Sequence, residues 1–225
     1  MLTYALVLVV GLVAGTVSGI VGTGATIILL PILVYTFGPR EAVPIMAIVA
    51  LMSNFAKITS WWKDIDWRAC GAYALGGIPA AALGARTLLV LPEKLLDITL
   101  GLFFLVMVPG RRWLATRNIK LNAWHLAIAG AVIGFLTGIV VSTGPLSVPA
   151  FAAYGLVKGA FIATEAAGSL AVYLSKSVVF RAFGALPLES IGKGLVVGSA
   201  LMAGSFLAKR FVVKMDPARF RLLMD

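Results

Sequence analysis

Two short stretches rich in glycine, threonine and serine interrupt long apolar segments, and their residue types suit the binding of an anion. They are Gly22-Thr23-Gly24 in the first half of the chain and Ser142-Thr143-Gly144-Pro145 in the second. Glycine lets one helix end and another begin, and the new helix presents unpaired N–H groups and the positive end of its dipole. The hydroxyl groups add donors, and proline suits a first helical turn. Each stretch therefore predicts a helix N-terminus that binds an anion.

Two lysines stand inside apolar segments, where a charge is costly and commonly has a function. Lys57 and Lys176 are 119 residues apart in the chain. Asn54 precedes Lys57 by three residues and therefore shares a helical face with it. We predict that the two lysines flank one anion site. The alternative for Lys57 is that its side chain extends to a membrane surface marked by Trp61 and Trp62.

Glu165 is a carboxylate well inside an apolar segment, and Met46 stands at the position 119 residues earlier. A carboxylate at membrane depth can carry a coupling proton. It can also pair with a nearby cation such as Lys158 or lie at an interface. A structural role is the preferred interpretation from the sequence.

The composition is that of a polytopic membrane protein. Of the 225 residues, 60% are apolar and 12% are charged, and the mean hydropathy is +1.01. A soluble domain carries about twice that charged fraction. The net charge is +10, and the Lys and Arg residues lie mainly between the apolar runs. This placement indicates loop charges that orient the protein in the membrane rather than a surface that binds nucleic acid. The apolar segments are 4–37, 41–62, 68–91, 93–109, 123–154, 159–183 and 188–213.

The chain contains an internal duplication. Comparing 10–21 with 129–140 at a shift of 119 gives six identities in twelve positions: Gly11/Gly130, Val13/Val132, Gly15/Gly134, Gly19/Gly138, Ile20/Ile139 and Val21/Val140. Glycines four residues apart are typical of closely packed membrane helices, so we interpret Gly15-xxx-Gly19 and Gly134-xxx-Gly138 as packing surfaces. Segments 4–37 and 123–154 are too long for one straight span of roughly 20 residues, and both carry a break near the middle.

The distribution of cations favours a hairpin at each break. If every segment crosses the membrane once, the two sides receive eight and nine Lys and Arg residues. If the two long segments turn back at their glycines, one side receives twelve and the other five; the twelve are Lys63, Arg68, Arg111, Arg112, Arg117, Lys120, Lys158, Lys209, Arg210, Lys214, Arg219 and Arg221. The positive-inside rule therefore predicts a cytoplasmic loop at 110–122 and an N-terminus outside.

We therefore predict an all-α, polytopic membrane helix bundle built from two inverted repeats, each with a broken or re-entrant first segment. The repeats are 1–110 and 123–225, with a basic cytoplasmic linker at 111–122. Pro92 opens segment 93–109, and Pro217 holds the equivalent place near the end of the chain. We expect a further span of roughly 15–20 apolar residues to follow Asp225.

Enzyme classes are disfavoured by what the sequence contains. It has no HExxH, no GxSxG and no pair of aspartates within a segment, so metal, serine and aspartyl hydrolysis lack their parts. Its one histidine, His125, cannot form a histidine metal cluster, and its one cysteine, Cys70, cannot form an intrachain disulfide. We expect no cofactor and no metal.

With both breaks identified, the chain resembles the sulfite exporter family of the TauE/SafE type. The resemblance is carried by GLVAGTVSGIVGTGATIILLPIL from Gly11 to Leu33, by GAVIGFLTGIVVSTGPLSVPAF from Gly130 to Phe151, and by the short turn at Asp66-Trp67. The usual triple glycine of the family is replaced at both breaks in this chain. The resemblance implies export of sulfite or a small organosulfonate across the bacterial inner membrane by a multi-pass protein that uses an ion gradient.

The resulting hypothesis is a secondary transporter whose halves rock around a midplane site. The candidate substrate-binding residues are Gly22, Thr23, Gly24, Asn54, Lys57, Ser142, Thr143, Gly144 and Lys176. The expected partners are a small sulfur-containing anion, a coupling ion (proton or sodium), the lipid bilayer and a second copy of the chain, and no nucleic acid. A passive anion channel is the alternative function, followed by an intramembrane enzyme.

Overall fold

The structure, a computed structural model, describes residues 2–22, 24–92, 120–139, 144–216 and 220, and all regular elements in these ranges are helical. The helices are α1 (Leu2–Val21), α2 (Ala25–Phe37), α3 (Pro39–Ser60), the 3₁₀ helix η1 (Trp62–Asp64), α4 (Trp67–Val90), α6 (Ala123–Ile139), α7 (Gly144–Ala153), α8 (Lys158–Ala182) and α9 (Leu188–Lys214). The predicted segments 41–62, 68–91, 159–183 and 188–213 correspond to single helices. Segment 93–109 lies outside the described residues.

Both long segments are divided into two helices. α1 ends at Val21 and α2 begins at Ala25, with Gly22 and Gly24 in left-handed conformations at φ 88° and 107°. Only glycine adopts these angles without strain, so the two glycines allow the interruption at this position. The predicted break in the first segment is therefore confirmed. In the second segment, α6 ends at Ile139 and α7 begins at Gly144, so that Pro145 falls in the first turn of α7 as expected.

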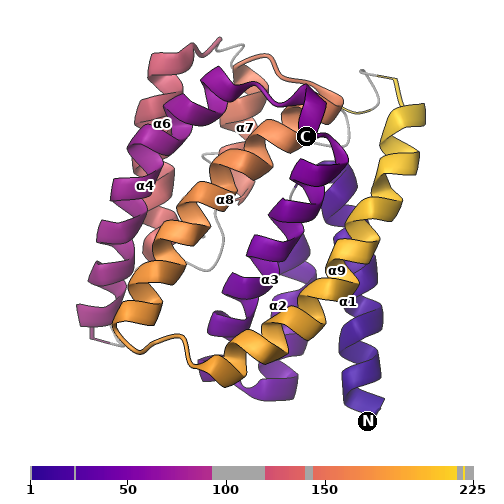
Figure 1. Cartoon of the computed structure of the whole chain (residues 1–225), viewed down its shortest axis with the longest axis vertical. Coiled ribbons are helices and arrows are strands. Elements are labelled where there is room, and N and C mark those ends of the chain that lie inside the picture. The colour runs from indigo at the N-terminus through magenta and orange to yellow at the C-terminus, as the bar shows by residue number, and fades with distance from the viewer. Residues whose placement is uncertain (1, 23, 93–119, 140–143, 217–219, 221–225) are drawn as a thin grey trace.

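In Figure 1, α4 and α6 lie on one side and α1 and α9 on the other, with α3 and α8 between them. Under the shift of 119 residues, α1 corresponds to α6, α3 to α8, and α4 to α9. Corresponding helices also have corresponding packing partners. The contact of α4 with α6 matches that of α9 with α1, and the contact of α4 with α8 matches that of α9 with α3. The duplication read from the sequence is thus present in the packing.

Glycines bring the outer helix pairs into backbone contact. A methyl group at Gly15 would collide with the backbone of Leu201 in α9, and one at Gly134 would collide with the backbone of Gly77 in α4. Close approach of this kind is what small residues at a spacing of four provide in membrane helices. The interpretation of both Gly-xxx-Gly pairs as packing surfaces is confirmed.

Polar caps fix the ends of α4 and α6. The Asp66 carboxylate accepts a hydrogen bond from the Ala69 N–H at 3.0 Å and caps the N-terminus of α4. Asn122 and His125 exchange two hydrogen bonds at the start of α6, which gives the histidine a capping role at the helix end. Within the described ranges, α4 and α9 are each long and apolar enough to cross a membrane.

Candidate functional site

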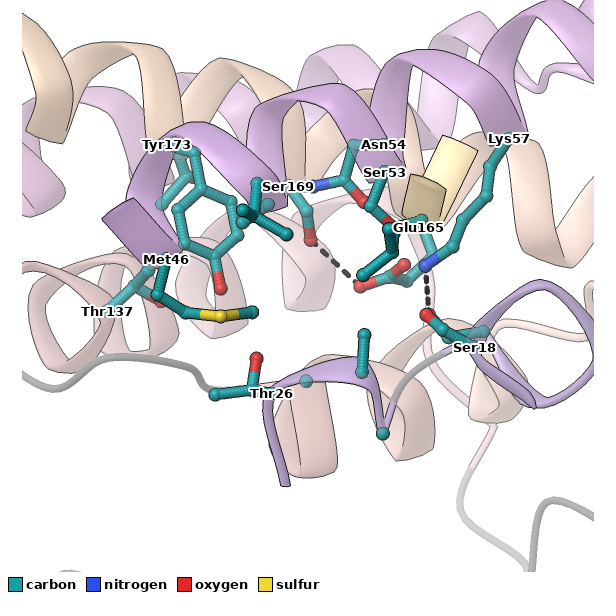
Figure 2. Close-up of a pocket in the computed structure, with 18 of the residues that line it drawn as sticks. Ser18, Thr26, Met46, Ser53, Asn54, Lys57, Thr137, Glu165, Ser169 and Tyr173 are labelled. Carbon is teal, nitrogen blue, oxygen red and sulfur yellow. Dashed lines mark hydrogen bonds between the residues drawn. The ribbon is translucent and has the colours of Figure 1, made fainter. Parts of the chain in front are cut away.

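A polar cavity lies where the broken helices meet α3 and α8, and side chains point into it from several helices (Figure 2). Its volume is about 50 Å³. One water molecule requires about 10–15 Å³ by this measure, so the cavity accommodates a few water-sized groups or one small polyatomic ion. The lining residues used below are Ser18, Gly22, Gly24, Thr26, Met46, Ala50, Ser53, Asn54, Lys57, Tyr73, Thr137, Gly144, Glu165, Ser169, Val172 and Tyr173.

The cavity is lined by residues of both repeats. Six pairs of its lining residues are related by the shift of 119: Ser18/Thr137, Ala25/Gly144, Met46/Glu165, Ala50/Ser169, Ser53/Val172 and Asn54/Tyr173. Residues equivalent by duplication meet in one space only if that space lies between the repeats. The cavity therefore occupies the centre of the duplicated architecture.

The N-termini of two helices border the cavity. Gly24 is the N-cap of α2, and Gly144 is the first residue of α7; both line the space. The first N–H groups of a helix have no partner within the helix, and they carry the positive end of its dipole. Thr26 adds a hydroxyl in the first turn of α2 and is seen pointing toward the cavity in Figure 2. The arrangement supplies donors and positive potential on both sides.

Lys57 is buried in the wall of this cavity, with 4% of its surface exposed. Its ammonium group donates a hydrogen bond of 2.6 Å to the carbonyl oxygen of Gly22, at the C-terminal end of α1. A cation at this end is favourable because it offsets the negative pole of the helix dipole. The side chain therefore does not extend toward Trp61 and Trp62, and the alternative of surface anchoring is wrong.

Lys176 has a similar but not identical environment. It is 2% exposed and donates a hydrogen bond of 2.8 Å to the carbonyl oxygen of Thr137, in the last turn of α6. It also lies over the ring of Phe180 at 5.1 Å. Thr137 lines the cavity, whereas Lys176 is not among the described residues that do. Thr137 therefore stands between the ammonium group of Lys176 and the cavity.

Glu165 lies in the cavity wall, although the sequence favoured a structural role for it. The side chain is 3% exposed, and its Oε1 accepts hydrogen bonds from Ser147 Oγ at 2.7 Å and from Ser169 Oγ at 2.8 Å. The sequence contained two signals for this position: Ser169 lies one helical turn beyond Glu165, and Met46 lies 119 residues before it. Ser18, Tyr73, Thr137, Ser169 and Tyr173 were also not predicted.

The structure brings together five of the nine predicted site residues. Gly22, Gly24, Asn54, Lys57 and Gly144 line the same cavity. Lys176 reaches its wall only through Thr137. The three remaining predicted residues, Thr23, Ser142 and Thr143, lie outside the described residues.

Comparison with known proteins identifies the family. The family described as Sulfite exporter TauE/SafE matches residues 7–225. A protein described as probable membrane transporter protein YjnA, from Bacillus subtilis (strain 168), is 23% identical over 231 residues, which cover 91% of this chain and 90% of that relative. No solved structure matches significantly. The doubled glycine breaks, the shared polar cavity and the match over nearly the whole length lead to one conclusion: the chain is a membrane-embedded protein of the sulfite exporter TauE/SafE family.

Proposed function

We propose that this protein is a secondary transporter that carries sulfite or a small organosulfonate across the bacterial inner membrane by alternating access, with the central cavity as its substrate site. The observation that carries the proposal is that the N-termini of α2 and α7 and the ammonium group of Lys57 border one buried polar space. Unpaired N–H groups, helix dipoles and a buried cation are the elements that bind an anion. Asn54 and the predicted hydroxyls of Thr23, Ser142 and Thr143 would complete the site.

The size of the cavity favours the smallest members of the substrate class. Sulfite has four non-hydrogen atoms, which suits a space for a few water-sized groups, about 50 Å³ in volume. An organosulfonate with a longer chain requires the helices to separate. We therefore expect sulfite and methanesulfonate to bind more tightly than larger sulfonates.

Alternating access is supported by the orientation of the repeats. In Figure 1, α3 rises from the lower to the upper end of the view while its equivalent, α8, descends. Opposite directions of equivalent helices are the mark of inverted repeats, in which one half rocks against the other around a fixed site. The contact of α1 with α2 after the break favours a hairpin at Gly22–Gly24 over a continuous crossing. We propose that both first segments are re-entrant in a multi-pass topology.

Counterflow in proteoliposomes tests this function. Vesicles that contain the protein and unlabelled sulfite should transiently accumulate labelled sulfite from outside, because a carrier returns faster when loaded. Vesicles with unlabelled sulfate inside serve as the matched control. Uptake that does not depend on internal sulfite would indicate a passive channel, and the absence of both binding and uptake would refute transport of this substrate class. Membership in a transporter family already points away from an enzyme.

A further inference from the structure

Glu165 is the one carboxylate among the described residues that line the cavity. It is related by the shift of 119 to Met46, and both residues line the space. The other repeat-related pairs in the wall are uncharged, so Met46/Glu165 is the pair that differs in charge; in addition, Lys57 lines the cavity whereas its equivalent Lys176 does not. The charged side chains among the described lining residues are Lys57 and Glu165.

The carboxylate lies where a bound anion must also lie. A space of about 50 Å³ leaves no room for an anion far from the groups that line it. Two negative charges about 5 Å apart repel strongly enough, at an effective dielectric constant of about 20, to lower affinity by about two orders of magnitude. Adding one proton to Glu165 removes this repulsion.

Resting on the proposed function, we infer that Glu165 is the proton site of the transporter and that one proton is bound together with each anion. The proton is taken from water on the side to which the cavity is open, resides on a carboxylate oxygen of Glu165 while the anion is bound, and is released to water on the other side. Because anion and proton favour each other's binding, the two move in the same direction and the coupling ion is a proton rather than sodium; export is then driven by the outward gradient of the anion, and the inward proton gradient would drive uptake. A monovalent anion is then carried without net charge.

The same carboxylate is tied to a broken helix. Ser147 lies in the first turn of α7 and donates to Glu165 Oε1, and its hydroxyl also lies 3.2 Å from the carbonyl oxygen of Gly144. Ser169, within α8, donates to the same oxygen. A change of charge at Glu165 therefore alters the contact that links the N-terminus of α7 to α8. This gives proton binding a direct route to the half-helix that borders the substrate.

Other groups around Glu165 titrate as well, and the experiment must separate them. Lys57 faces it from α3, Tyr73 from α4 and Tyr173 from α8 itself, and Lys176, also on α8, lies behind Thr137 at the cavity wall. The remaining lining residues of α1, α2, α6, α7 and α9 near the carboxylate are Ser18, Gly22, Gly24, Ala25, Thr26, Thr137, Gly144 and Leu201, which do not titrate in the neutral range. Loss of a proton from Lys57 or from either tyrosine would also weaken anion binding at high pH. A substitution of Glu165 removes only the part of the pH dependence of anion affinity that is due to Glu165.

The test measures the dissociation constant of methanesulfonate, whose charge is constant from pH 5 to 9, for the full-length protein in nanodiscs without sodium. Affinity of the unmodified protein should fall as pH rises, approaching tenfold per pH unit. Glu165→Gln keeps an acceptor for both serines and should bind with little pH dependence, about a hundredfold more tightly than the unmodified protein at pH 9. Equal pH dependence in both proteins, or a requirement for sodium, would overturn the inference.

A second pair of variants tests the assignment without changing the carboxylate. Ser169→Ala removes a hydroxyl that stabilises ionised Glu165, so the midpoint of the pH profile should move to higher pH by about one unit. Ser177→Ala is the matched control on the same helix, because its buried hydroxyl has no hydrogen-bond partner among the described residues. An unchanged midpoint in Ser169→Ala, or equal shifts in both variants, would overturn the inference. If neither sulfite nor methanesulfonate binds at any pH, the proposed function itself fails; binding without this proton linkage refutes only the role of Glu165.

Discussion

Replacing Lys57 with methionine tests whether its buried charge serves the anion or only the end of α1. Methionine keeps most of the length and apolar surface of lysine and removes the ammonium group. An anion about 4 Å from that group gains at most about 4 kcal/mol at an effective dielectric constant of about 20. The loss of a charged hydrogen bond usually amounts to about 1.5–3 kcal/mol. We therefore expect the dissociation constant for sulfite to rise about 12- to 150-fold.

The same substitution removes the donor that Gly22 now has at 2.6 Å, which should lower the free energy of unfolding by about 1–3 kcal/mol. Lys209→Met is the matched control, because Lys209 donates to the carbonyl oxygen of Ser60 at 2.5 Å and lies over Trp61, outside the cavity. The measurements are thermal unfolding without ligand and titration with sulfite. Unchanged sulfite affinity in Lys57→Met, with destabilisation like that of Lys209→Met, would show that Lys57 is only a helix cap.

Three further predictions concern stability, each measured by unfolding in detergent. Gly130→Ala should destabilise by about 1–3 kcal/mol, because its methyl group would collide with the backbone of Tyr73, whereas Gly71→Ala meets nothing within 4 Å and should be neutral or stabilising; equal effects would contradict the close-packing interpretation. Asp66→Ala should lose about 1 kcal/mol as the cap of α4 is removed, and full stability would disprove that role. Gly24→Ala has open space but a φ of 107°, so strain alone should lower stability by about 1–2 kcal/mol; an unaffected variant would contradict a required left-handed conformation.

The sequence alone was sufficient for features that depend on neighbouring residues. Apolar run lengths located the helices, and the glycines at 22 and 24 located the break, because a left-handed backbone is accessible to few other residues. The shift of 119 also identified the duplication, which the packing of equivalent helices repeats. Asn54 and Lys57 were correctly assigned to one face, since a helix brings residues three apart to the same side.

Tertiary structure decided how equivalent residues differ. Lys57 and Lys176 are identical under the repeat, yet one donates to Gly22 and the other to Thr137, whose equivalent is Ser18, one helical turn before Gly22. That difference depends on how far each broken helix slides past its neighbour, which no local pattern encodes. The packing of the helices likewise places Glu165 in the cavity wall and brings Ser147 of α7 beside it. The sequence determined where the helices break, and the packing of the two halves determined which charges face the space between them.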